Sequence, residues 1–161
     1  MAKLQKTNAM RQLDAAKIEY EIKDYVPDEN DLSGVHIAEQ IGLSPSQTFK
    51  TLVTRGDKTG VVVFCIPADC EIDLKAAAAV TKNKRIEMLH TSELLATTGY
   101  IRGGCSPVGM KKKFPTYIDE SALSFDKITV SSGTKGMQLL LSPTELVKFI
   151  GANVCSVTTK Q

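Results

Sequence analysis

The residues best suited to chemistry lie in a glycine-rich segment, residues 99–115 of the 161-residue chain. Within it, Gly103, Gly104 and Gly109 stand with Pro107 in a stretch of seven residues. Glycine has no Cβ, so its backbone turns tightly and approaches a ligand closely. The backbone N–H groups of such a loop can point at an anion or at a developing oxyanion. The segment therefore predicts a site for a small polar or anionic group.

Three consecutive lysines, Lys111, Lys112 and Lys113, follow the glycines, and Arg102 and Lys135 are further cations in or near glycine-rich sequence. Such a cluster suits the phosphate backbone of a nucleic acid. A run of charges that is merely solvated at the surface is the alternative, and it is about as common. Because the net charge of the chain is only +2, any contact with nucleic acid must come from a local patch.

Lys50 is the most suggestive single residue outside this segment. Strand periodicity places it on one face with Leu52, while Phe49 and Thr51 occupy the other face. A lysine among apolar neighbours either extends to water or contacts an anion. Extension to water is the commoner outcome, so the residues alone leave both interpretations open.

The sequence contains no convincing nucleophile–base pair. Cys105 lies in the glycine-rich segment, but a nucleophilic thiol needs a base such as histidine, and no histidine is near it in sequence. The cysteines form no C-x-x-C pair, and neither histidine has metal-ligand spacing. We therefore expect reduced thiols, no metal and no cofactor. These expectations cover the four cysteines and two histidines of the chain, which are Cys65, Cys70, Cys105, Cys155, His36 and His90.

The elements that must position these residues alternate irregularly. We expect helices over residues 8–17, 33–42, 73–80, 92–99 and 142–151, and strands over residues 18–25, 48–55, 61–66, 85–89, 115–119, 127–131, 137–141 and 153–157. Hairpins with interspersed helices, and no regular β-α-β order, predict an α+β fold. Its sheet is expected to be mixed and barrel-like, with peripheral helices.

Composition indicates a single globular domain over residues 1–161. Apolar residues make up 42% of the chain and charged residues 24%, which are ordinary values for a domain with a buried core. No apolar run approaches the roughly 20 residues that span a bilayer, and the N-terminal residues lack the apolar core of a signal peptide. We therefore expect a cytoplasmic protein with no membrane partner.

Four short segments occur in the order typical of a known family: residues 49–52 (FKTL), 73–75 (DLK), 103–109 (GGCSPVG) and 130–136 (VSSGTKG). On these segments the chain resembles the YbaK/EbsC family of aminoacyl-tRNA deacylases, relatives of the editing domain inserted in bacterial prolyl-tRNA synthetase. The resemblance extends from about residue 7 to residue 157. Within the family the chain is most similar to the free-standing Cys-tRNA(Pro)/Cys-tRNA(Cys) deacylases.

The resemblance implies a pocket for the 3′ end of a charged tRNA. It implies catalytic roles for Lys50, which holds the ligand, and for Gly103 and Gly104, whose backbone shapes the pocket around the scissile ester. The implied substrate-binding positions are Tyr25, Thr51, Ser106, Ser131 and Gln138. Two positions depart from relatives: some carry an acid where this chain has Gln138, and some carry an aliphatic residue where it has Cys105.

The resemblance also implies a mechanism and a partner. The thiol of a mischarged cysteine attacks its own ester and leaves as a cyclic thiolactone, so the enzyme acts by positioning. Prolyl-tRNA synthetase is the implied partner, and residues 111–113 are the expected contact with the acceptor stem. Two alternatives stay open: a water-dependent deacylase for Ala-tRNA(Pro), and a non-catalytic regulator that binds a nucleotide or an RNA end.

Overall fold

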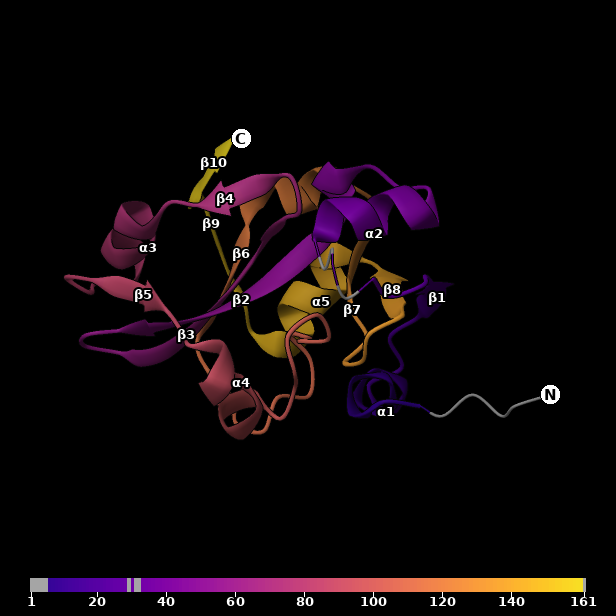
Figure 1. Ribbon diagram of the computed structural model, residues 1–161, viewed down its shortest axis with the longest axis horizontal. Helices are drawn as coiled ribbons and strands as arrows, with labels where there is room; N and C mark the ends of the chain where they lie inside the picture. Colours follow the sequence, from indigo (N-terminus) through magenta and orange to yellow (C-terminus); the bar gives the residue numbers. More distant parts are fainter. Residues whose placement is uncertain (1–5, 29, 31–32, 161) are drawn as a thin grey trace.

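Three sheets organise the chain in a computed structural model that describes residues 6–28, 30 and 33–160 (Figure 1). The largest has the strand order β5-β2-β3-β6-β9, the second has the order β1-β8-β7, and β10 pairs with β4 in the third. The strand bounds are β1 Tyr20–Asp24, β2 Phe49–Gly56, β3 Gly60–Pro67, β4 Cys70–Ile72, β5 Ile86–Met88, β6 Thr116–Asp119, β7 Ile128–Ser131, β8 Met137–Leu141, β9 Asn153–Cys155 and β10 Thr158–Lys160.

Short helices surround the sheets. The α-helices are α1 Asn8–Ala15, α2 Gly34–Ile41, α3 Leu74–Thr81, α4 Thr91–Thr98 and α5 Pro143–Ile150, and two 3₁₀ helices cover η1 Pro45–Gln47 and η2 Glu120–Ser124. In Figure 1, α3 lies near one end of the large sheet and α2 near the other. In the described part of the chain, each helix is too short to cross a membrane.

The predicted α+β class with a mixed sheet is confirmed. Strands β6 and β9 extend the antiparallel β2–β3 hairpin in parallel fashion, whereas the other strand pairs are antiparallel. Within the described residues the strands do not close into one barrel. A single parallel bridge, between Thr48 and Thr129, joins the large sheet to the three-stranded sheet.

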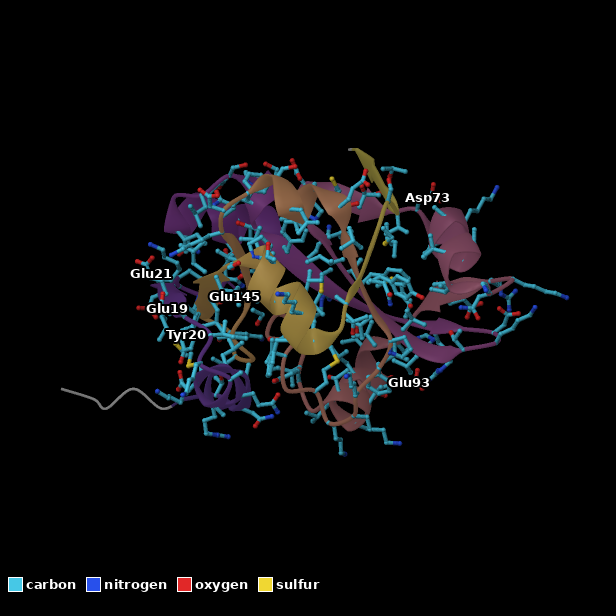
Figure 2. The ribbon with its side chains drawn as sticks, turned by 180° about the vertical axis from the view of Figure 1, so that it is seen from behind. Glu19, Tyr20, Glu21, Asp73, Glu93 and Glu145 are labelled. Carbon is cyan, nitrogen blue, oxygen red and sulfur yellow. The ribbon has the colours of Figure 1, made fainter. Side chains whose placement is uncertain are left out.

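Local capping explains why the helices form where the sequence predicts them. Ser33 and Ser142 each accept a hydrogen bond from the backbone N–H three residues on, at 3.2 and 3.3 Å. Asp73, at the start of α3 in Figure 2, accepts two such bonds at 3.1 Å. Gly42 and Gly151 end α2 and α5 with φ of +76° and +65°, a conformation that favours glycine.

The hairpin of β2 and β3 separates two apolar clusters. Phe64 and Ile66 of β3 face one cluster, which α3 covers, while Cys65 faces the other cluster with Phe49 of β2. The second cluster also takes Leu146 of α5. Because β3 is buried on both sides, its position is fixed by packing, and the start of β2 that pairs with its end is held with it.

Asn83 links the turn of this hairpin to the end of α3 through hydrogen bonds. Its Oδ1 accepts hydrogen bonds from the backbone N–H groups of Lys58 (2.8 Å) and Thr59 (3.0 Å). Its Nδ2 donates to the hydroxyls of Thr59 (3.0 Å) and Thr81 (2.7 Å). The side chain is buried, so each of these bonds replaces one that water would otherwise make.

We predict that Asn83→Ala lowers the free energy of unfolding by about 2–4 kcal/mol, because two backbone N–H groups lose their buried acceptor. Urea unfolding followed by circular dichroism measures the change. Lys84→Ala, at an exposed neighbour, is the control and should stay within about 0.5 kcal/mol of wild type. Equal stability of the two variants would contradict the structural role of Asn83.

Candidate functional site

A pocket of about 420 Å³ lies where the start of β2 meets three other parts of the fold. The beginning of α2, the glycine-rich loop after α4, and the paired ends of β7 and β8 form its other walls. Its volume is in the range of small-ligand sites. The lining residues are Ser33, Gly34, Val35, Ile37, Thr48, Phe49, Lys50, Thr51, Leu52, Ala68, Arg102, Gly103, Cys105, Ser131 and Gln138.

The pocket brings together five of the residues that the sequence predicts for the site. They come from three separate segments and are Lys50, Thr51, Gly103, Ser131 and Gln138. Three other predicted residues do not line it. Gly104 is buried directly behind the lining residue Gly103, Ser106 is buried within the loop, and Tyr25 lies after β1, where its backbone N–H donates to Gly136.

Residues 111–113 lie apart from the pocket. Lys112 and Lys113 border a second hollow, of about 270 Å³, together with the aromatic residues Phe114 and Phe149. Lys111 instead donates to the carbonyl of Ala96 at 3.4 Å. The lysine run therefore belongs to the outer surface of the loop, as a contact for a larger partner would require.

Lys50 sits half-buried on β2, opposite Ile66 of β3. Its Nζ donates to the carbonyl oxygen of Ala68 at 3.4 Å. Burial lowers the pKa of Lys50, and the negative charges of Glu71 and Asp69 oppose that effect. A partly desolvated ammonium group next to a pocket is suited to hold an electron-rich group of a ligand.

The glycine-rich loop is held in one shape. The N–H of Gly104 donates to the carbonyl of Ile101 at 3.0 Å, which closes a turn around Gly103 at φ +86°. A Cβ on Gly104 would lie 3.2 Å from backbone atoms of Thr134 and Lys135, tighter than most Cβ contacts, so a larger residue would require the two segments to shift apart slightly. Within the loop, the buried Ser106 Oγ accepts from the N–H of Val108 at 3.2 Å. Ser106 therefore shapes the loop.

Two buried oxygen atoms in the pocket wall have no ordinary hydrogen bond. Gln138 is 4% exposed, and its Oε1 has no partner among the described residues. The buried Thr51 Oγ1 interacts with the weakly polar thiol of Cys65 and has no nitrogen or oxygen partner among the described residues. An unpaired buried acceptor costs about 1–3 kcal/mol. A ligand that donates hydrogen bonds would remove that cost, which supports the assignment of this pocket as a binding site.

The pocket wall carries no acid–base pair. Among its described lining residues the charged groups are Lys50 and Arg102, with no aspartate, glutamate or histidine. Cys105 also lines the pocket, but burial raises its pKa from 9.0 to about 11. Its thiol is therefore protonated at neutral pH and is a poor nucleophile.

Sequence reasoning missed one wall of the pocket. The start of α2 contributes Ser33, Gly34, Val35 and Ile37. A Cβ on Gly34 would come within 2.7 Å of the Cβ of Ala68, so glycine lets the helix approach the end of β3. The sequence signal for this wall was a glycine directly after a serine N-cap. That signal does not reveal which residue the helix contacts.

Comparison with known proteins identifies the family of the chain. Residues 33–149 match the model of the aminoacyl-tRNA editing domain family. The chain is 48% identical over 157 residues to EbsC of Enterococcus faecalis, a protein named as a candidate Cys-tRNA(Pro)/Cys-tRNA(Cys) deacylase, with 98% of this chain and 96% of EbsC covered. The chain therefore belongs to the aminoacyl-tRNA editing domain family. This membership confirms the family and the enzyme class, aminoacyl-tRNA deacylase, that the motifs predict.

Solved structures confirm the fold. The hypothetical protein APE2540 superposes with a TM-score of 0.86 at 24% identity, covering 95% of this chain and all of that one. A candidate trans-editing enzyme for prolyl tRNA synthetase gives a TM-score of 0.81 at 22% identity, with 94% and 95% of the two chains covered. At these identities the likeness establishes a shared fold.

We predict that Cys105 reacts with iodoacetamide at pH 8 about a hundredfold more slowly than an unperturbed thiol, because a pKa of about 11 leaves about one thiolate in a thousand instead of one in ten. Mass spectrometry of the Cys105 peptide measures the rate. The same residue in urea-unfolded protein is the control and should react at the ordinary rate. Equal rates in the folded and unfolded chains would show that the fold leaves the Cys105 thiol unperturbed, and would contradict its raised pKa.

Proposed function

We propose that the chain, as one editing domain over residues 1–161, removes cysteine from mischarged Cys-tRNA(Pro) and acts in trans. The observation that carries the proposal is the pocket that brings Lys50 and the Gly103 turn into one lining without any general base in its described wall. A substrate that supplies its own nucleophile suits such a pocket. The relative EbsC, which is named for Cys-tRNA(Pro) and Cys-tRNA(Cys), supports the same substrate and adds Cys-tRNA(Cys) as a second one.

The proposed reaction needs no protein nucleophile. The cysteine sulfur of the substrate attacks the ester carbonyl carbon and forms a C–S bond. The C–O bond to the ribose breaks, and the proton of the thiol passes to the ribose oxygen, so the products are deacylated tRNA and a cyclic thiolactone. The enzyme contributes orientation, which accounts for a large part of the barrier in well-aligned intramolecular reactions.

The pocket residues have distinct roles in this proposal. Lys50 anchors the ligand electrostatically, and the backbone N–H group of Gly103, in the turn that Gly104 closes, stabilises the oxyanion that forms at the carbonyl. The unpaired Oε1 of Gln138 and hydroxyl of Thr51 receive hydrogen bonds from the substrate. Gln138 accepts from the α-ammonium group without carrying a charge of its own.

Two further residues contribute to the site, Ser131 in the pocket lining and Tyr25 beyond it. Ser131 accepts from the N–H of Gly133 at 3.2 Å, which fixes the segment that Gly104 touches. Tyr25 is half-exposed beyond the lining and is proposed to border the route of the RNA end. The remaining RNA contact is assigned to the lysine run. A small net charge gives weak intrinsic affinity for tRNA, so we further propose that prolyl-tRNA synthetase presents the substrate in the cytoplasm.

We predict that Lys50→Ala reduces deacylation of Cys-tRNA(Pro) by about a hundredfold or more, because the ligand loses its charged anchor in a desolvated site. Release of labelled cysteine measures the rate. Lys75→Ala, at an exposed lysine of α3, is the control and should retain wild-type activity. Circular dichroism checks that both variants fold. Wild-type activity in folded Lys50→Ala would refute the proposed role.

The substrate thiol separates this mechanism from water-dependent removal of alanine. Cys-tRNA(Pro) should be deacylated, while Ala-tRNA(Pro) and tRNA charged with S-methylcysteine should stay intact, because neither has a free thiol. Capture of the thiolactone by an added amine identifies the product. Rapid hydrolysis of Ala-tRNA(Pro) would favour the alternative enzyme, in which the pocket positions a water molecule.

We predict that charge reversal of Lys111, Lys112 and Lys113 to glutamate weakens tRNA binding and lowers the slope of log K against log salt by up to about three, since each lysine–phosphate contact contributes about one. Filter binding at several salt concentrations measures the slope. Reversal of three other lysines, Lys58, Lys82 and Lys84 near the hairpin turn, makes the same change in net charge. Equal slopes in the two variants would refute the assigned contact.

A further inference from the structure

Arg102 occupies a defined position at the edge of the pocket. The hydrogen bond from Gly104 N–H to the Ile101 carbonyl, at 3.0 Å, makes Arg102 and Gly103 the two central residues of a four-residue turn. Gly103 has φ of +86°, whereas Arg102 is not among the non-glycine residues with positive φ. This combination is a type II turn, in which only the third residue needs glycine. The turn therefore presents Arg102 at its tip.

The turn is anchored from behind. Gly104 packs closely against the backbone of Thr134 and Lys135, where an added Cβ would lie 3.2 Å from its neighbours. Tyr100, just before the turn, is buried and donates its hydroxyl to the Val108 carbonyl at 2.6 Å. Arg102 itself is exposed, lines the pocket, and makes no hydrogen bond or ion pair with any described residue. A free guanidinium group thus stands on a rigid support at the pocket edge.

The two cations of the pocket wall differ in depth. Lys50 is half-buried and directs its Nζ to the Ala68 carbonyl, with its pKa lowered by burial. Arg102 stays in solvent and lacks any such partner. The acids labelled in Figure 2 lie on or beside β1, α3, α4 and α5, and none of them lines the pocket. Nothing in the described wall competes with a ligand for the guanidinium group.

We propose that Arg102 is a phosphate-binding residue that receives the phosphodiester on the 5′ side of the terminal nucleoside, while the nucleoside and its ester occupy the pocket. The identity of this ligand rests on the proposed function. A phosphodiester remains charged and hydrated, so it stays at the solvent-exposed edge and does not enter the interior. A guanidinium group binds two phosphate oxygens through parallel N–H donors, which fixes the orientation of the strand as well as its position.

This assignment gives the type II turn a function. One central residue of the turn, Arg102, holds the phosphate, and the other, Gly103, presents its backbone N–H group to the ester. The distance between phosphate and ester in the RNA is set by one ribose. A rigid turn therefore places the ester in the pocket once the phosphate is bound. Arg102 acts as a positioning residue and takes no part in bond breaking.

Binding of product fragments tests the proposal without any deacylation step. Isothermal titration at low salt compares adenosine, which has no phosphate, with the dinucleotide CpA, which has the phosphodiester. Wild-type protein is expected to bind CpA about tenfold more tightly than adenosine. Arg102→Gln should lose this preference and bind adenosine as wild type does. Arg102→Lys should keep part of it, because the charge remains and the two-point contact is lost.

Arg85→Gln is the matched control, since Arg85 is an exposed arginine distant from the pocket lining, and it should keep the full preference for CpA. Equal affinities of wild-type protein for adenosine and CpA would overturn the proposal. So would a tenfold preference that persists in Arg102→Gln. If wild-type protein binds CpA through Arg102 but leaves Cys-tRNA(Pro) intact, the proposed function fails while the phosphate site stands.

Kinetics supply a second readout. With Cys-tRNA(Pro), Arg102→Gln is expected to raise KM by about tenfold and to change kcat less, because the phosphate contact is present in both the bound and the transition state. With 3′-cysteinyl-adenosine, which has no phosphate, the rise in KM should be much smaller. An equal rise with both substrates would show that Arg102 acts elsewhere than on the phosphate.

Discussion

The pocket depends on a close contact between two loops, which glycine residues on both loops make possible. Gly104 lies against the backbone of Thr134 and Lys135, where a Cβ would be 3.2 Å from its neighbours. Gly133 makes the reciprocal contact, since a Cβ there would lie 2.8 Å from the ring of Tyr100. The two loops therefore support each other. A larger residue at either glycine would separate them and move the turn that carries Arg102 and Gly103 away from β2.

This contact explains how residues from two different sheets line one pocket. Lys50 and Thr51 come from the large sheet, while Ser131 and Gln138 come from the three-stranded sheet, and one bridge between Thr48 and Thr129 connects the two. A closed barrel would hold these walls together by continuous strand pairing. Here the glycine-rich loop spans the gap, which makes its conformation a condition for the site.

Much of the fold could be predicted because its signals are local. Ser33, Asp73 and Ser142 cap helices through contacts within three residues, and the hairpin of β2 and β3 has a short turn between two apolar runs. Strands β4 and β10 were missed, because each is three residues long and exists only through pairing with the other. Their sequences, CEI and TTK, are too short for an alternation of apolar and polar residues to indicate a strand.

The sequence predicted those residues of the candidate site that belong to recognisable motifs. Lys50, Gly103 and Gln138 were identified from sequence and meet in one pocket. The wall formed by α2 was not predicted, because Val35 and Ile37 are ordinary helix residues whose contact with the pocket is decided by tertiary packing. From sequence, Arg102 was recognised only as part of a basic cluster with residues 111–113. The structure separates Arg102 from these lysines, because the turn around Gly103 places it at the pocket edge.

The absence of a base from the described pocket wall bears on how selectivity arises. A site with its own activated nucleophile would attack any aminoacyl ester that fits, and it would then need steric exclusion of correct substrates. A site that only orients the ester leaves the choice to the substrate, because only a side chain with a nucleophile at the right distance reacts. The high pKa of Cys105 is consistent with this arrangement, since a protonated thiol in the wall does not compete with the thiol of the substrate. In the proposed mechanism, selectivity is a property of the reaction, and the fold has to supply a rigid turn, a charged anchor and the proposed phosphate contact.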